Sequence, residues 1–303
     1  NEVRRFDVVH AHAVFLAPQT HAIRLGARAG VPVLLAPRGM LDRELLKSRS
    51  RWIKAAWLAL VERRNLSQAS ALHFTTRAEG VRYEELGLPR RPSRVIPNGL
   101  GLSRFVNLNE VTTLLSLRDP HELLCLGRVN WKKGLDRAIR GLAYLGEPWR
   151  LTIAGNDEEG YTPVLERLAR ELGVASRVRF VGEQRGEAKW SLLDRAGCLL
   201  LPSRSENFGI VVLEAMARGC PVAVTPEVGL ADFVREHRAG LVIGSEPEAM
   251  AAQVAAWASN RAEVAEEVGR ALSAAHSRFS WPAVASAMVE WYRELAAGRT
   301  RAA

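Results

Sequence analysis

The stretch of sequence that decides the fold runs from Cys198 to Pro221 and reads CLLLPSRSENFGIVVLEAMARGCP. Its first four residues form an uninterrupted apolar run, which predicts a buried strand of a parallel sheet. A polar loop follows, and Gly209 begins a segment with apolar residues at helical spacing. The loop therefore lies at the carboxyl end of a strand, where open parallel sheets bind their ligands.

Two acids bracket the start of this predicted helix. Glu206 precedes it, and Glu214 lies about 9 Å farther along its axis, at a rise of about 1.5 Å per residue. The free N–H groups and the dipole at this end of the helix suit a phosphate. Apolar neighbours flank Glu214, so ligand hydroxyls would satisfy its carboxylate. The structural alternatives are an ion pair between Glu214 and Arg218 and an ordinary helix-start acid at Glu206.

Outward from this stretch, strand-like and helix-like segments alternate along almost the whole chain. The predicted strands cover residues 7–12, 31–36, 71–75, 94–96, 122–126, 150–154, 178–181, 198–201, 221–224 and 241–243. The predicted helices cover residues 18–29, 43–64, 77–86, 135–144, 162–172, 187–194, 209–218, 230–236, 247–257, 261–276 and 281–297. This alternation predicts an α/β fold of two Rossmann-like domains, each with a parallel sheet between helices.

A second candidate ligand loop follows the predicted strand 122–126. It contains Gly127 and Arg128, and Lys133 and Gly134 open the next helix. The guanidinium of Arg128 and the ammonium of Lys133 are suited to bind a diphosphate, the first as a fork and the second as a point charge. The alternative is that both cations are solvated or paired with Asp136.

Several common signatures are absent from the sequence. It contains no G-x-G-x-x-G, no G-x-x-x-x-G-K, no H-E-x-x-H and no G-x-S-x-G. Their absence argues against a dinucleotide oxidoreductase, a P-loop ATPase, a zincin and a serine hydrolase. An Asp-x-Asp pair is also missing, so we expect no metal ion bridging a diphosphate and no cofactor.

The net charge of +9 is concentrated in the first third of the chain. Residues 1–104 hold 18 Lys and Arg against 8 Asp and Glu, and the remainder holds 24 against 25. The segment from Arg43 to Arg64 combines seven cations with apolar residues at helical spacing. These apolar residues are Trp52, Ile53, Ala56, Trp57, Leu60 and Val61. The pattern favours peripheral contact with an anionic membrane, and the alternative is a helix that packs its tryptophans on its own domain.

The cysteines and the lengths of the apolar runs indicate the cellular compartment of the protein. Cys125, Cys198 and Cys220 stand singly in apolar contexts, which predicts buried thiols in a reducing compartment. No apolar run approaches the roughly 20 residues that cross a bilayer. We therefore expect a cytoplasmic protein, free or at the inner face of the membrane. No nucleic-acid motif accompanies the basic charge, so no nucleic acid is expected as a partner.

Taken together, these motifs resemble the retaining GT-B glycosyltransferases of glycosyltransferase family 4, the glycosyl transferases group 1. The resemblance covers nearly the whole chain. It rests on the Glu-x7-Glu signature of Glu206 and Glu214, on the loop at residues 127–134, on VIPNG at residues 95–99 and on DVVHAH at residues 7–12.

The resemblance implies a role for each matched residue. Arg128 and Lys133 would bind the diphosphate of the donor and stabilise it as it leaves. Glu206 would contact hydroxyls of the transferred sugar, and Glu214 would bond the ribose hydroxyls. His12 would contact the donor sugar from the first domain, and the alternative is that it is a structural histidine. The main chain of four residues would hold sugar and phosphate: Asn207, Phe208, Gly209 and Ile210.

The resemblance also implies a domain organisation, with two sheets facing across a cleft. We expect a partial acceptor-side domain over residues 1–103, a linker over 104–118, a nucleotide-sugar donor domain over 119–280, and a crossover helix and tail over 281–303. Family members begin with strand and helix units that precede the segment matched by residues 7–12. The first domain is therefore expected to be incomplete and the chain N-terminally truncated.

The implied reaction is metal-independent transfer of a sugar, of the hexosyltransferase type and with retention of configuration. The donor would be a nucleotide-diphosphate sugar and the acceptor a saccharide or a lipid-linked saccharide, in surface polysaccharide or glycolipid synthesis. Two alternatives stay open: a GT-B nucleotide-sugar epimerase and a basic nucleic-acid binding module.

Overall fold

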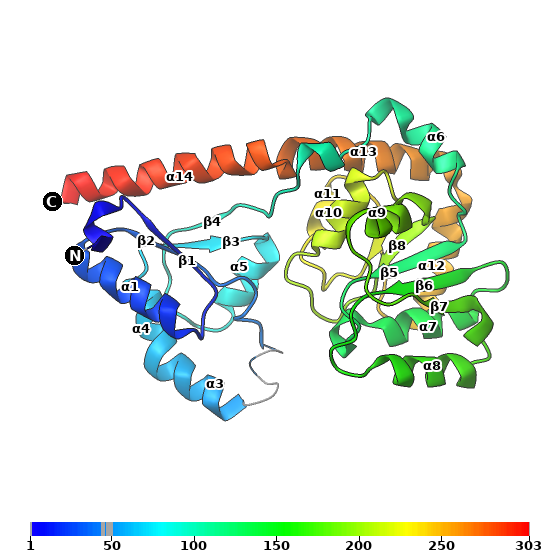
Figure 1. Ribbon diagram of the computed structural model, residues 1–303, viewed down its shortest axis with the longest axis horizontal. Coiled ribbons are helices and arrows are strands. Elements are labelled where there is room, and N and C mark those ends of the chain that lie inside the picture. The colour runs from blue at the N-terminus through cyan, green and yellow to red at the C-terminus, as the bar shows by residue number, and fades with distance from the viewer. Residues whose placement is uncertain (1, 44–45, 47–50, 303) are drawn as a thin grey trace. The chain divides into compact units, whose positions relative to one another are not determined.

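The computed structural model describes residues 2–43, 46 and 51–302 and divides the chain into two compact units. Unit 1 comprises Asn1–Asn98 and Pro282–Ala303, and unit 2 comprises Gly99–Trp281. Each unit is built on one sheet of parallel strands with helices packed against it (Figure 1). The predicted α/β class with two parallel sheets is therefore confirmed.

The sheet of unit 1 has four strands in the order β1-β2-β3-β4. They are β1 (Val9–His12), β2 (Val33–Ala36), β3 (Ala71–Phe74) and β4 (Ser93–Val95). The helices are η1 (Glu2–Arg5), α1 (Ala17–Ala29), α3 (Arg51–Trp57), η2 (Leu58–Glu62), α4 (Arg63–Gln68), α5 (Arg77–Glu84) and α14 (Trp281–Ala302), which belongs to this unit from Pro282 on.

Alternate residues of the unit 1 strands face opposite sides of the sheet, and helices cover both sides. Leu35 packs in one apolar cluster with Ile23 of α1 and Leu66 of α4. Leu34, the preceding residue of β2, packs in another cluster with Trp291 of α14. The last helix of the chain thus covers the second face of the first sheet, which buries the apolar residues of both faces.

The basic segment is not one continuous α-helix. Between α3 and α4 lies the π-helical turn η2, which ends at the buried Glu62. The Glu62 carboxylate accepts hydrogen bonds from the main-chain N–H of Phe15 at 2.7 Å, from Trp57 Nε1 at 2.9 Å and from Asn65 Nδ2 at 3.1 Å. These bonds stabilise the wider turn. Three charged residues of the predicted segment, Glu44, Lys47 and Arg49, lie outside the described residues.

The sheet of unit 2 has six strands in the order β10-β9-β8-β5-β6-β7. They are β5 (Glu122–Leu126), β6 (Arg150–Ala154), β7 (Val178–Phe180), β8 (Cys198–Leu201), β9 (Val222–Val224) and β10 (Leu241–Val242). The helices are η3 (Leu102–Arg104), η4 (Leu108–Glu110), α6 (Val111–Ser116), η5 (Trp131–Lys133), α7 (Leu135–Tyr144), α8 (Thr162–Glu171), η6 (Ala175–Arg177), α9 (Gly186–Arg195), α10 (Ile210–Ala217), α11 (Ala231–Glu236), α12 (Pro247–Ser259) and α13 (Arg261–Phe279). Two apolar clusters fill the faces of this sheet.

Residues 104–118, expected to be a linker, pack against unit 2. Val111 and Leu115 of α6 are buried in its core. Arg118 is buried as well and donates to the carbonyl oxygens of Ala196 at 2.9 Å and Arg218 at 2.7 Å. The polar composition concealed this packing because only one face of a short helix is apolar. Within the described residues, no helix is long and apolar enough to span a bilayer.

The carboxyl ends of β5 and β6 approach each other so closely that only glycine fits at residue 155. A Cβ at Gly155 would lie 1.7 Å from the carbonyl oxygen of Gly127. We expect Gly155→Ala to lower the free energy of unfolding by about 1–3 kcal/mol, because backbone must move to admit the methyl group. Urea unfolding measures the change. Gly146→Ala is the control, since nothing lies within 4 Å of the corresponding Cβ position, and an equal effect of both substitutions would contradict the prediction.

Candidate functional site

Neighbouring strands place two loops side by side in unit 2. β5 and β8 are paired in parallel, so both end at the same edge of the sheet. The loops that follow are in backbone contact, because the N–H of Arg204 donates to the carbonyl oxygen of Lys132 at 2.7 Å. Gly134 has a φ of 63°, and a Cβ there would lie 2.0 Å from the carbonyl oxygen of Pro202. Glycine at residue 134 therefore allows the loops to meet.

These two loops line a pocket of about 260 Å³ at the carboxyl ends of the strands. Five residues singled out in the sequence line it together: Arg128, Lys133, Glu206, Ile210 and Glu214. The other lining residues are Leu126, Gly127, Gly155, Asn156, Glu183, Gln184, Lys189 and Val211. The structure thus brings both predicted cations and both predicted acids to one cavity.

Each of the two predicted acids faces a lysine. Lys133 Nζ forms an ion pair with Glu206 across the two loops. Lys189, from α9, places its Nζ 2.7 Å from Glu214 Oε1. All four side chains are largely buried, which strengthens their attraction over that of surface pairs. Arg128 is more exposed, and its Nη1 lies 3.7 Å from Glu158 Oε2.

The alternative pairings considered from the sequence are wrong. Arg218 does not pair with Glu214, because its Nε and Nη2 each donate to the carboxylate of Asp194 at 2.7 Å. This hydrogen-bonded pair raises the pKa of Arg218. Asp136 pairs with Arg204 at 2.5 Å and not with either cation of the loop before it. The ion pairs of Glu206 and Glu214 are therefore those with Lys133 and Lys189.

The start of α10 contributes main-chain groups to the site more than it contributes side chains. Gly209 caps the helix with a φ of 88°, and the first N–H groups of any helix lack intrahelical partners. The side chain of Phe208 is buried against Phe279, at a ring-centroid distance of 6.1 Å, so only its main chain can meet a ligand. Of the segment predicted to hold sugar and phosphate, Ile210 lines the pocket, and Asn207, Phe208 and Gly209 are not among the lining residues.

Sequence reasoning missed several residues of the pocket. Lys189 was not singled out, although it stands in the first turn of the helix that follows β7. Asn156 follows β6, and Glu183 and Gln184 follow β7. Their places after neighbouring parallel strands are the signal that could have found them. Among the described residues, no group of three or more His, Cys, Asp or Glu could hold a metal ion.

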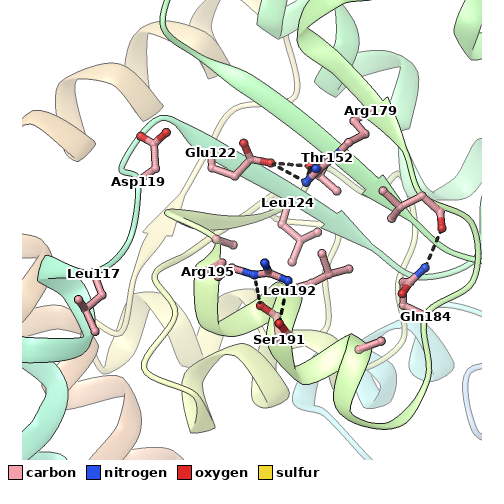
Figure 2. Close-up of a pocket in the computed structure, with 13 residues that line it drawn as sticks. Leu117, Asp119, Glu122, Leu124, Thr152, Arg179, Gln184, Ser191, Leu192 and Arg195 are labelled. Atoms are coloured by element: carbon pink, nitrogen blue, oxygen red, sulfur yellow. Dashed lines mark hydrogen bonds and ion pairs between the residues drawn. The ribbon is translucent and has the colours of Figure 1, made fainter.

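Figure 2 shows a larger pocket of about 480 Å³ in the same unit. On its walls Thr152 donates to Glu122 at 2.5 Å, Arg179 donates to Thr152 at 3.1 Å, and Arg195 donates to the Ser191 hydroxyl at 2.8 Å. These polar groups are thus bonded to one another. The hollow runs beside α9 and the middle of the strands, so the smaller pocket at the strand ends is the better candidate for a ligand site.

His12 lies in unit 1, at the carboxyl end of β1, and is surrounded by polar groups. Its Nδ1 accepts a hydrogen bond from Arg38 Nε at 3.2 Å, and its ring lies 4.0 Å from that of His10. His10 bonds Tyr292 of α14 at 2.7 Å through Nδ1 and His73 at 3.3 Å through Nε2. His73 in turn bonds the carbonyl oxygen of Ile96 at 2.7 Å. The predicted active-site histidine therefore belongs to a network, which the sequence did not reveal.

Burial keeps the histidines of this network neutral. It lowers the pKa of His10 to about 3, with smaller contributions from His12, His73 and Arg38. Burial also lowers the pKa of His73 to about 4, against the opposing effect of the bond to Ile96. Partial desolvation, followed by the charge of Arg38, lowers the pKa of His12.

Comparison with known families covers both units. The family model for "Glycosyl transferases group 1" matches residues 113–272, and that for "Glycosyl transferase 4-like domain" matches residues 2–99. The D-inositol 3-phosphate glycosyltransferase of Corynebacterium urealyticum is 33% identical over 204 residues, which are 65% of this chain and 45% of that protein. The chain spans about half the length of the curated relatives that it matches.

Solved structures show the same architecture. Sucrose-phosphate synthase from Thermosynechococcus elongatus matches 97% of this chain and 75% of its own, with a TM-score of 0.77 and 22% identity. HepE of Anabaena in complex with UDP and glucose matches 97% of this chain and 79% of its own, with a TM-score of 0.76 and 20% identity. At these identities the likeness concerns the fold, and it confirms the predicted GT-B class.

The histidine network predicts that acid destabilises unit 1. The folded state keeps His10 and His73 neutral, while the same groups in the unfolded chain titrate near their ordinary pKa of about 6.5. Their contribution is therefore fully present above pH 6.5 and is lost as the pH falls toward the folded-state pKa, about 4 for His73 and about 3 for His10. We expect the free energy of unfolding to fall by at most about 1.4 kcal/mol per pH unit for each of these histidines.

Chemical unfolding at pH 7 and pH 5 measures this loss. His10→Phe removes one titrating group and should shrink the difference between the two pH values. His21→Gln removes an exposed histidine of α1 and serves as the control. Equal stability of the unsubstituted chain at both pH values would contradict the expectation.

Proposed function

The chain belongs to the glycosyl transferases group 1 family, and on this premise we propose that it is a metal-independent, retaining glycosyltransferase. It moves a sugar from a nucleotide-diphosphate donor to a saccharide or lipid-linked acceptor, in surface polysaccharide or glycolipid synthesis. The observation that carries the proposal is the pocket in which Lys133 faces Glu206 and Lys189 faces Glu214 at the carboxyl edge of the sheet.

A nucleotide-sugar donor complements the charges of this pocket. Its diphosphate takes the place of Glu206 beside Lys133 and approaches Arg128 and the start of α10, where the helix dipole favours an anion. The carboxylate of Glu206 is then released to accept hydrogen bonds from hydroxyls of the transferred sugar. Glu214, held by Lys189, accepts hydrogen bonds from the ribose hydroxyls. Lys133 and Glu206 thus each exchange one partner for another, and Glu214 keeps Lys189, which limits the cost of desolvation.

The same arrangement supports the chemical step. As the bond between the sugar and the diphosphate breaks, negative charge develops on the leaving phosphate. Arg128, Lys133 and the amides that begin α10 are fixed in place before the reaction, so they stabilise this charge without reorganising. For His12, in unit 1, we propose a hydrogen bond to a hydroxyl of the substrate. Support for a uridine nucleotide comes from the fold, since related structures of HepE contain UDP and UDP-glucose.

An exposed surface of unit 1 supports a further proposal. It consists of Arg51, Trp52 and Ile53 of α3, Leu60 of η2 and Arg63 of α4. Trp52, Ile53 and Leu60 are 75%, 70% and 77% exposed, and the two arginines are also exposed. Trp57 donates to Glu62 of its own unit, and the guanidinium of Arg51 lies 4.9 Å from the centroid of the exposed Trp52 ring. We propose that this surface contacts anionic lipid at the cytoplasmic face of the membrane, where a lipid-linked acceptor would lie.

Substitution of Lys133 tests the proposed donor site. We expect Lys133→Ala to lower turnover by on the order of 10²- to 10³-fold, because a fixed charge that stabilises the leaving group is lost. Turnover is measured as release of the nucleoside diphosphate from UDP-, GDP- and ADP-sugars, with and without EDTA. Lys132→Ala is the matched control, since the neighbouring Lys132 does not line the pocket. Near-normal turnover of Lys133→Ala would refute the assignment.

Product analysis separates the transferase from its rivals. Transfer requires an acceptor, whereas an epimerase converts the nucleotide sugar to an isomer without one. A thermal-shift panel of the same donors reports binding directly, because a ligand that binds only the folded state raises the melting temperature. Salt-dependent binding of RNA without any response to nucleotide sugars would instead favour the nucleic-acid binding module.

Liposome flotation tests the proposed membrane contact. The chain should float with vesicles that contain anionic lipid at low salt, and the bound fraction should fall as salt screens the attraction. The double substitution Trp52→Ser and Ile53→Ser should reduce flotation, whereas Leu117→Ser, which alters a leucine of unit 2 that is 76% exposed, should not. Absence of flotation at low salt would refute this proposal and leave the donor site unaffected.

A further inference from the structure

Arg38, which follows β2 in unit 1, determines which nitrogen of His12 carries a proton. Its Nε donates to His12 Nδ1 at 3.2 Å, and its Nη2 lies 3.1 Å from the same nitrogen. Its Nη1 donates to the side-chain oxygen of Asn98 at 2.9 Å. A guanidinium has donors only, so His12 Nδ1 must accept. The neutral ring of His12 therefore carries its proton on Nε2.

The loop that presents Arg38 is held in an unusual conformation. Arg38 has a φ of 56°, which is uncommon for a residue with a side chain. The next N–H, of Gly39, donates to the buried carboxylate of Glu79 at 2.6 Å, and the same carboxylate accepts from the N–H of Thr75 at 2.7 Å. Glu79 thus fixes the loop after β2 to the end of β3. A strained backbone conformation persists where surrounding contacts hold it in place, and such conformations are concentrated at functional sites.

The neighbouring histidines carry their protons in the same way. The carbonyl oxygen of Ile96 can only accept, so His73 donates to it from Nε2 and has a bare Nδ1. His10 Nε2 donates to this Nδ1, and the hydroxyl of Tyr292 donates to His10 Nδ1. Among the described residues, the titratable or charged groups that contact His12 or its bonded neighbours are His10, His73, Tyr292 and Arg38. None of these four is a carboxylic acid that would favour a protonated ring.

We propose that Arg38 is a positioning residue that keeps His12 in the Nε2–H tautomer, so that His12 donates a hydrogen bond to a substrate hydroxyl and does not act as a base. This role rests on the proposed function. The His12 side chain is exposed, and the structure gives its Nε2 no hydrogen-bond partner among the described residues. Its N–H is therefore accessible to a ligand oxygen, which would accept the bond.

Nitrogen-15 NMR of the imidazoles in the full chain tests the proposal, because the shifts of Nδ1 and Nε2 report which nitrogen is protonated. The chain has seven histidines, and the signals lost in His12→Gln identify those of His12. Near neutral pH, we expect the unsubstituted chain to show a bare Nδ1 and a protonated Nε2. In Arg38→Met the shifts of Nδ1 and Nε2 should both move toward the mean of the bare and protonated values, because the two tautomers then exchange. The pKa of His12 should rise, because an adjacent cation is removed.

Two further variants separate this role from a general structural one. Arg38→Lys keeps the positive charge and a hydrogen-bond donor, so the nitrogen-15 shifts of His12 should stay close to those of the unsubstituted chain. Arg91→Met removes an arginine of the same unit that bonds only the carbonyl oxygen of Leu66 among the described residues, and it should leave His12 unchanged. Turnover of nucleotide sugar should fall on the order of 10- to 10²-fold in Arg38→Met.

The outcomes distinguish this proposal from the proposed function. A proton on Nδ1 of His12 in the unsubstituted chain, or unchanged His12 signals in Arg38→Met, would overturn the role of Arg38. If Arg38→Met does not fold, loss of the expected His12 shifts in Arg38→Lys together with unchanged activity would overturn it equally. The expected signals in a chain that turns over no nucleotide sugar would support the tautomer and refute the transferase.

Discussion

Parallel pairing of β5 with β8 is the constraint on which the candidate site depends. Because these strands are neighbours and point the same way, the loops after them meet at one edge of the sheet. Glycine at residue 134 allows backbone contact there, and the contact brings Lys133 to Glu206. A side chain at residue 134 would separate the two loops, and one at residue 155 would separate the ends of β5 and β6. The chemistry of the pocket is thus a consequence of strand order and of close backbone packing.

Much of the fold could be predicted because it depends on local patterns. Apolar runs of strand length, separated by segments with helical periodicity, predicted β5, β6, β8 and α7 with the bounds that the structure has. Two features depend on tertiary contacts and were missed. The helix α6 has six residues, too few for a periodic signal, and its place is fixed by Val111 and Leu115 in the core. The turn η2 is stabilised by Glu62, whose partners lie on separate segments.

The candidate site was predictable in part for the same reason. Arg128, Lys133, Glu206 and Glu214 follow the two strands with the clearest sequence signals, and the structure places them in one pocket. Their partners are not encoded at any fixed spacing. Lys189 reaches Glu214 from a different helix, and the network around His12 joins β1, β3 and α14 with the loop after β2. Such contacts follow from topology and packing, which a single sequence does not reveal.

The central claim is that the pocket between the two loops binds a diphosphate, which replaces the carboxylate of Glu206 beside Lys133. Calorimetric titration of the unsubstituted chain with nucleoside diphosphates and the matching monophosphates tests this most directly. The account predicts that one diphosphate binds at least about tenfold more tightly than its monophosphate, a difference of about 1.4 kcal/mol. Equal affinity for the two, or no binding of any diphosphate, would contradict it.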